Sequence, residues 1–124
     1  MSQEIPTVSI VLPNGAAAEV GGSSTTKISP NKGIYQGTIC LVKVVTPDFT
    51  NAVTTTVRLY DRNGILKYQS AALAEASGAS GFAIPVNIPI HYGEYVTAQP
   101  SGDPGAGGGT VTIDMEFIPD TVQP

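Results

Sequence analysis

The 124-residue chain is long enough for one domain with one hydrophobic core, and its composition excludes several classes of function. Ten Asp and Glu against six Lys and Arg give a net charge of -4, and the six bases are scattered, which disfavours nucleic-acid binding through clustered cations. Because Cys40 is the only cysteine, the chain has neither an intrachain disulfide nor a cysteine-based zinc site.

The surface of the folded chain is expected to be mostly neutral. Charged residues make up 13% of the sequence, against about 25% in ordinary soluble domains. Either much of the surface is covered in an assembly, or the chain is simply a Ser/Thr-rich β protein with few charges. The beginning of the chain has no basic segment followed by a long apolar one, and no stretch approaches the ~20 apolar residues of a membrane span. We therefore expect a soluble protein made in a cytoplasm.

The first part of the chain predicts one strand and one weakly structured segment. Apolar side chains at every second position of residues 5–12 predict a strand, which the Pro13-Asn14-Gly15 turn ends. Residues 14–33 are poor in large apolar side chains, and only residues 25–28 favour a short strand there. This segment is either a flexible arm that orders against a partner or a plain surface loop.

The middle of the chain predicts a central strand and a hairpin. Residues 37–46 are apolar on both faces, which is typical of a strand inside a sheet. Residues 52–60 alternate apolar and polar side chains, and Asn63-Gly64 supplies the positive φ of a tight turn before the return strand 65–69. Residues 53–69 therefore predict a β-hairpin.

A proline-containing strand follows after a loop over residues 71–81. Residues 82–90 alternate apolar side chains with Pro85 and Pro89 among the others. Proline cannot donate to a sheet ladder, so we expect an edge strand or an irregularly paired one. Residues 94–99 predict the next strand.

The end of the chain contains a glycine-rich loop and the clearest strand pattern. Residues 100–108, PSGDPGAGG, predict a flexible connector. In residues 109–118 four apolar side chains alternate with polar ones, so one face of this strand is expected to pack on the core: Val111, Ile113, Met115 and Phe117.

These eight candidate strands predict an all-β fold, an antiparallel two-sheet sandwich of the jelly-roll type, as a single domain over residues 1–124. An immunoglobulin-like sandwich is the alternative, although the Cys, Trp, Cys arrangement of antibody domains is absent from the sequence.

No motif predicts catalysis or a cofactor. The glycine-rich loop lacks the Gly-Lys-Ser/Thr of a phosphate-binding loop, Thr110 stands where the dinucleotide pattern needs its last glycine, and a strand follows. Asp114 and Glu116 share a strand face and could act as paired carboxylates or bind calcium weakly. A solvated or inter-subunit face is the interpretation we favour for them.

The remaining reactive side chains are isolated. Cys40 lies in a strand pattern and is expected to be a buried, inert thiol. His91 is the only histidine, which excludes a multi-histidine metal site, and we expect it at an exposed or interface position. Five tyrosines could stack on sugar rings, although strand tyrosines more often cover sheet edges or interfaces: Tyr35, Tyr60, Tyr68, Tyr92 and Tyr95. The sequence predicts a protein that is not an enzyme, with no catalytic, cofactor-binding or metal-binding residues.

The order of these patterns suggests a family. A strand leads to the hairpin TTTVRLYDRNGILKYQS, and then come the apolar strand FAIPVNIPIHYGEYVTAQ, a glycine-rich loop and the last strand GTVTIDMEFI. The most specific motifs within this order are Leu59-Tyr60-Asp61 and Gly93-Glu94-Tyr95-Val96. Over residues 37–118 this order resembles small all-β structural proteins of tailed bacteriophages, of the head decoration or cement type. The resemblance implies a protein that reinforces the capsid where major capsid subunits meet, with no catalytic residues.

We therefore expect a virion structural protein on the capsid surface, made in the host cytoplasm, with the major capsid protein as its partner. We expect a homo-oligomer, a trimer rather than a dimer, that binds neither nucleic acid nor membrane. Weak contacts repeated over a symmetric shell would give a large total affinity. The alternatives are a carbohydrate-binding sandwich on a tail or host-facing surface, using Tyr92 and Tyr95, and a neck or tail connector protein.

Overall fold

The computed structural model describes residues 7–15, 17–21, 37–90 and 93–119, and these form eight β-strands and no helix. Accordingly, nothing in the described ranges is a helix long and apolar enough to cross a membrane. The strands are β1 Thr7–Leu12, β2 Val20–Gly21, β3 Gly37–Val45, β4 Thr55–Tyr60, β5 Leu66–Gln69, β6 Phe82–Ile90, β7 Tyr95–Pro100 and β8 Gly109–Pro119.

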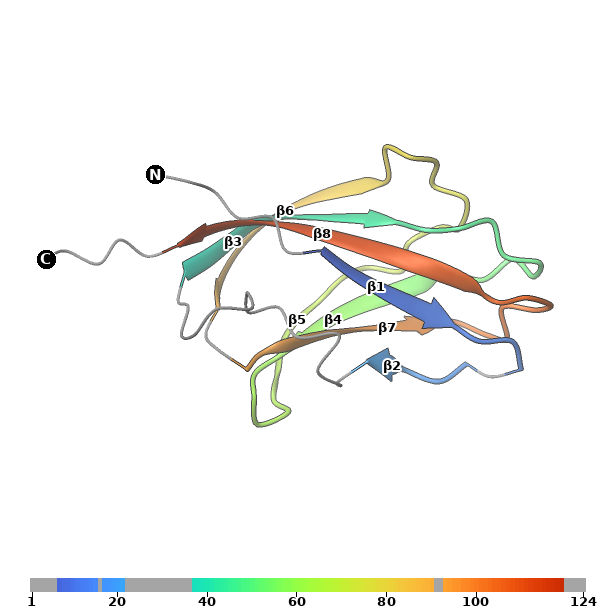
Figure 1. Cartoon of the computed structure of the whole chain (residues 1–124), viewed down its shortest axis with the longest axis horizontal. Coiled ribbons are helices and arrows are strands. Elements are labelled where there is room, and N and C mark those ends of the chain that lie inside the picture. The colour runs from blue at the N-terminus through green and yellow to red at the C-terminus, as the bar shows by residue number, and fades with distance from the viewer. Residues whose placement is uncertain (1–6, 16, 22–36, 91–92, 120–124) are drawn as a thin grey trace, which may run out of the picture.

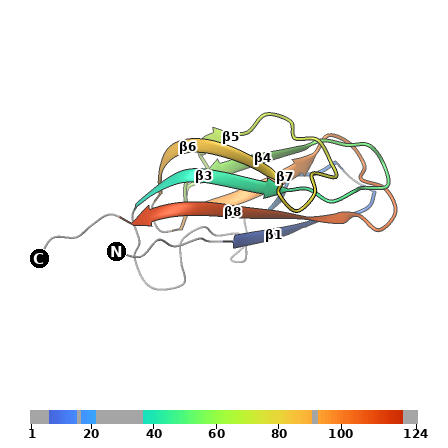
Figure 2. The same cartoon turned by 90° about the horizontal axis from the view of Figure 1, so that it is seen from above.

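The strands form two antiparallel four-stranded sheets that pack face to face (Figures 1 and 2). The order is β1-β8-β3-β6 in the first sheet and β2-β7-β4-β5 in the second. The pairs are therefore nested, β1 with β8, β2 with β7, β3 with β6 and β4 with β5, as in a long hairpin rolled into a sandwich. This is the jelly-roll order. The predicted fold class is confirmed, and the immunoglobulin-like alternative is wrong.

The core lies between the two sheets and is built from alternate residues of both. On β8, Val111, Ile113, Met115 and Phe117 are fully buried, as their spacing predicts. This strand pairs with β1 on one side and β3 on the other, so it is central in its sheet. On β4, Val57 and Leu59 close the core from the opposite layer.

The predicted central strand β3 is confirmed, but it contains an irregularity. Ile39 pairs with Phe117 whereas Leu41 pairs with Glu116, so β3 has one extra residue against β8. Such a bulge reverses the alternation of side chains, and Ile39 and Val42 are consequently both buried. Cys40 lies at this bulge and is only partly buried, with Sγ 3.6 Å from the Glu116 carbonyl oxygen. The expectation of a buried thiol is therefore wrong.

Strand β6 lies at the edge of the first sheet, as its prolines predict. Among the strands that the structure describes, it pairs only with β3, and its Pro85 and Pro89 are exposed. Because proline offers no N–H, these residues discourage another strand from joining this edge.

The predicted hairpin is confirmed and is closed by Asp61. One carboxylate oxygen, Oδ1, accepts hydrogen bonds from the backbone N–H groups of Asn63, at 2.8 Å, and Ile65, at 2.9 Å. Gly64 has a φ of 84°, which glycine adopts without strain. Asn63 does not have a positive φ. The turn therefore differs from the tight two-residue turn in which both Asn63 and Gly64 would have positive φ.

The glycine-rich loop, for which the composition predicts a flexible connector, makes hydrogen bonds to two neighbouring loops. The Asp103 carboxylate accepts hydrogen bonds from the N–H groups of Gly15, at 2.7 Å, and Gly105, at 2.9 Å. The Asn51 amide donates to the Asp103 carbonyl at 2.9 Å, and the Thr50 hydroxyl donates to the Ala106 carbonyl at 2.9 Å. These bonds join three loops at one end of the sandwich.

The segment 14–33 contains a strand that the sequence did not predict. Val20 pairs with Ala98 and Gly21 with Thr97, so β2 forms an edge of the second sheet. Two residues are too few to give a hydrophobic period, which explains the omission. The strand expected at residues 25–28 lies outside the described residues, and so does most of the expected arm.

Candidate functional site

A cluster of hydrogen-bonded polar side chains lies on the outer face of the second sheet. Strand pairing places Tyr60 beside Leu66 and Tyr95, and Arg58 beside Gln69 and Thr97. Two parallel rows therefore cross β5, β4 and β7. We call them the apolar row, Leu66, Tyr60 and Tyr95, and the polar row, Gln69, Arg58 and Thr97.

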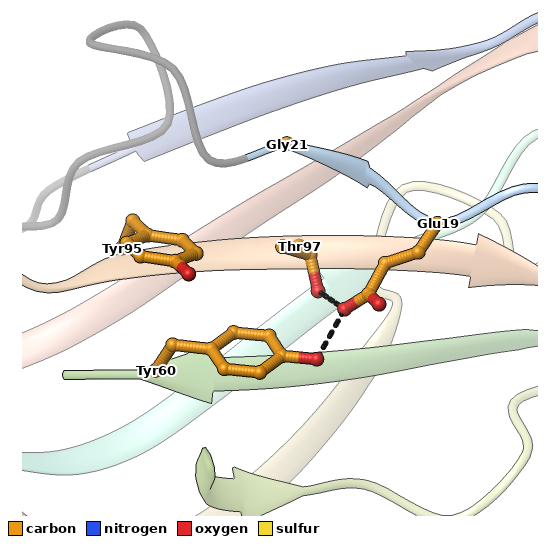
Figure 3. Close-up of a pocket in the computed structure, with 5 residues that line it drawn as sticks. All are labelled: Glu19, Gly21, Tyr60, Tyr95 and Thr97. Carbon is orange, nitrogen blue, oxygen red and sulfur yellow. Dashed lines mark hydrogen bonds between the residues drawn. The ribbon is translucent and has the colours of Figure 1, made fainter. Parts of the chain in front are cut away.

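Glu19, just before β2, joins the two rows (Figure 3). Its Oε2 oxygen accepts hydrogen bonds from the Tyr60 and Thr97 hydroxyls, each at 2.5 Å. The same oxygen lies 3.6 Å from Nη1 of Arg58. One carboxylate oxygen therefore has three partners from β4 and β7, and these contacts fix the edge strand β2 on the sheet.

Arg58 is itself held on both sides. Its Nε donates to Oε1 of Gln69 at 2.9 Å, and its Nη1 donates to Oε1 of Gln99 at 2.8 Å. The Gln99 amide donates in turn to the Ala17 carbonyl at 3.0 Å. Because each planar group is fixed by a neighbour, the cluster is ordered before any ligand arrives.

The cluster shifts the pKa values of two of its members in opposite directions. Burial acts to raise the pKa of Glu19, but the hydrogen bonds from Thr97 and Tyr60 and the charge of Arg58 outweigh it and hold this pKa below its ordinary value. The hydrogen bond to Glu19, with some burial, raises the pKa of the Tyr60 hydroxyl. Near neutral pH the carboxylate is therefore charged and the phenol keeps its proton.

An open pocket of about 270 Å³ lies among these residues (Figure 3). Its aromatic wall is the stacked pair of Tyr60 and Tyr95, whose ring centroids are 5.2 Å apart with 17° between the planes. Glu19, Thr97 and Gly21 complete the lining. Such a pocket offers flat apolar surface beside a hydrogen-bond acceptor, which suits binding rather than catalysis.

Gly21 keeps the pocket open. Its φ is 132°, and a Cβ atom there would lie 2.7 Å from the Val96 carbonyl oxygen and 3.1 Å from Cγ2 of Thr97. A larger residue would therefore strain β2 as well as narrow the space above Thr97.

The carboxylates singled out in the sequence lie on the other outer face, that of the first sheet. Asp114 and Glu116 share this face, as predicted, and line a second hollow of about 220 Å³ with Leu41 and Lys43. Asp114 accepts a hydrogen bond from the Thr7 hydroxyl at 2.7 Å. Across the ranges that the structure describes, no three His, Cys, Asp or Glu side chains are arranged to hold a metal ion.

The tyrosines of the sequence are divided by the fold. Tyr60 and Tyr95 come together at the pocket, whereas Tyr68 packs partly against the core, and burial raises the pKa of its hydroxyl. His91, Tyr35 and Tyr92 lie outside the described residues. Sequence reasoning missed Glu19, Arg58 and Thr97. The alternation over residues 52–60 does place Arg58 on the outer face. Its contact with Glu19, however, depends on the pairing of β2 with β7.

Comparison of the chain with known proteins adds no family. No protein-family model matches it, and no curated protein matches it either.

Proposed function

We propose that this chain is a non-enzymatic structural protein of a tailed-phage virion, a decoration or cement protein that binds the major capsid shell and stabilises it. The proposal begins from the resemblance over residues 37–118 and takes its physical support from one feature of the fold. That feature is the nearly neutral outer face of the first sheet.

Most outward positions of this face carry uncharged side chains. Its outward positions on β1, β8, β3 and β6 are occupied mainly by Thr, Ser, Val, Ala and Pro, and its charged side chains are Lys43, Asp114 and Glu116. The cores of protein interfaces are likewise poor in charged residues. A face of this kind supports docking on another protein.

Two large aliphatic side chains project from the same face. Val11 on β1 is 60% exposed and Ile118 on β8 is 48% exposed. Exposed aliphatic groups gain free energy when a partner covers them, at roughly 25 cal/mol per Å² of apolar surface. The hollow lined by Leu41, Lys43, Asp114 and Glu116 gives such a partner a place to insert a polar or charged side chain.

The partner in this proposal is the major capsid protein, and the site of action is the capsid surface of the virion. Repetition over a symmetric shell converts modest contacts into firm attachment, above all if the chain is itself a trimer placed at threefold positions. No reacting group is required for this role.

The proposal is tested by sedimentation of the purified chain with mature heads of the phage that encodes it. We expect saturable binding at micromolar concentrations of chain, with a plateau at a fixed ratio to the major capsid protein. Heads carrying the chain should also resist heat better than bare heads. Absence of binding at micromolar concentration would contradict the proposal.

A further inference from the structure

The pocket beside Tyr60 and Tyr95 brings aromatic surface and planar hydrogen-bonding groups together, and attachment to a capsid through the first sheet makes no use of it. We propose that this pocket binds a single neutral pyranose ring. The chain would then carry two separate binding faces, one on each sheet.

The aromatic side of the pocket provides the apolar contact. The C–H groups on one face of a pyranose pack well on flat aromatic surface, and Tyr60 on β4 and Tyr95 on β7 supply such surface. The stacked rings are also held in place, since the Tyr60 hydroxyl is bonded to Glu19. Little side-chain entropy is therefore lost when a ligand binds.

The carboxylate of Glu19 provides the polar contact. Its Oε2 oxygen is occupied by Tyr60, Thr97 and Arg58. Its Oε1 oxygen makes no hydrogen bond to the other residues drawn in Figure 3 and lies on the side away from the two hydroxyls. With the side chain 33% exposed, this second oxygen can accept a hydrogen bond from a sugar hydroxyl.

The charge balance favours a neutral ligand. A carboxylate beside two aromatic rings would by itself attract an amine or a guanidinium group. Here Arg58 already pairs with Glu19, so the site has a cation in place. An anion is disfavoured by the carboxylate at the pocket wall. A ligand rich in hydroxyl groups satisfies the site without adding charge.

The size of the pocket favours one ring. Its volume of about 270 Å³ is slightly below the range of about 300–1,000 Å³ that is usual for drug-sized ligands. Because the pocket is open, further sugar units of a glycan would extend into solvent. Affinity for one ring should therefore be weak, with a Kd in the millimolar range.

The test is a titration of the intact chain with methyl glycosides of glucose, galactose, mannose, N-acetylglucosamine and rhamnose, followed by amide chemical shifts in NMR spectra. Nα-acetyl-lysine methylamide and inorganic phosphate serve as the cationic and anionic probes. We expect saturable shifts with at least one glycoside, confined to residues 17–21, 58–60 and 95–97. Saturation by the lysine derivative or by phosphate at lower concentration than by every glycoside would overturn the proposal, as would the absence of shifts with all five glycosides.

Two variants identify the pocket as the site. Tyr95→Leu keeps an apolar side chain but removes the ring, and Glu19→Gln keeps the shape but removes the charge. Each is expected to weaken glycoside binding about tenfold. Asp114→Asn, on the other sheet, is the matched control and should bind as the wild type does. Spectra of the free variants establish that each is folded, and folded variants that bind with wild-type affinity would place the sugar elsewhere and overturn the proposal.

Discussion

The hydroxyl of Thr55 is buried without a hydrogen-bond partner, which is energetically unfavourable. Thr55 is fully buried at the start of β4, and among the buried polar groups that the structure describes its hydroxyl is the one without a hydrogen-bond partner. A buried hydroxyl without a partner loses its hydration and gains nothing in exchange. The backbone at this position is well satisfied, since Thr55 exchanges two hydrogen bonds of 2.8 Å with Leu73.

We therefore expect Thr55→Val to stabilise the protein. Valine has nearly the same shape and removes the unsatisfied hydroxyl, so the free energy of unfolding should rise by about 1 kcal/mol. Thr46→Val is the matched control. The Thr46 side chain is equally buried, but it donates to the Ala74 carbonyl at 2.8 Å and accepts from the Ser77 N–H at 3.2 Å. That variant should lose about 1–3 kcal/mol. Urea denaturation measures both, and a loss of stability in Thr55→Val would contradict the account.

Glu19 makes stability depend on acid pH. Its pKa in the folded chain lies below the ordinary value of 4.5, so the folded state binds fewer protons than the unfolded state as pH falls. The stabilisation is thus present above pH 4.5 and is lost as pH falls through the lower, folded pKa. Glu19→Gln should be less stable than wild type at pH 7 and should show a flatter loss of stability below pH 4.5.

The raised pKa of Tyr60 makes stability depend on alkaline pH, in the opposite direction from Glu19. A raised pKa means that the contribution is fully present below the ordinary value of 10.0 and is lost at higher pH, as the phenol ionises beside the Glu19 carboxylate. Urea denaturation at a series of pH values measures both the loss of stability at acid pH and the loss at alkaline pH. Asp48→Asn, which changes an exposed carboxylate outside this network, serves as the control for the loss of one negative charge.

Among the elements, the β4–β5 hairpin depends on one side chain. Asp61 closes the turn by accepting hydrogen bonds from the N–H groups of Asn63 and Ile65. Asp61→Ala should lower the free energy of unfolding by about 1 kcal/mol, whereas Asp61→Asn keeps an acceptor oxygen and should lose much less. Urea denaturation distinguishes them. Equal losses in the two variants would mean that the hydrogen bonds are not what holds the turn.

Long strands were predictable from the sequence because their side chains alternate over enough residues to reveal a buried face. The four buried residues of β8, from Val111 to Phe117, are the clearest case. The prolines of β6 also predicted its edge position, because a missing N–H has the same effect in any fold.

Features that depend on pairing were not predictable. The bulge at Cys40 was not predicted because residues 39–42 around it are all apolar, and the only trace of it in the sequence is that the two outward polar residues, Thr38 and Lys43, lie an odd number of positions apart. The pocket is hidden for a related reason. Glu19 contacts Tyr60 and Thr97 because β2 pairs with β7. A two-residue strand is too short to show the alternation of side chains from which this pairing could be predicted.

The whole molecule presents two outer faces of different chemistry. The first sheet exposes mostly uncharged side chains with Val11 and Ile118, whereas the second exposes Leu66 beside the hydrogen-bonded cluster around Glu19 and Arg58. If the neutral face binds the capsid, the pocket face is turned outward. The polar cluster would then be the part of the chain that meets the surroundings of the virion.

The assembly state is a prediction at the same scale. We expect a trimer, because a decoration protein at threefold positions of a shell matches that symmetry. Size-exclusion chromatography with light scattering at two concentrations should give three times the chain mass of 12.8 kDa at both. A monomer at both concentrations would contradict the trimer while leaving attachment through the neutral face to be tested directly.

The direct test compares head binding by two variants with the same substitution on opposite faces. Thr112 on β8 and Thr56 on β4 are both half-buried outward residues of central strands. In Thr112→Arg an unpaired charge would be covered by the capsid, so binding to heads should weaken about 100-fold, or about 3 kcal/mol. Thr56→Arg should bind as the wild type does. Loss of binding in Thr56→Arg with binding retained in Thr112→Arg would contradict attachment through the first sheet.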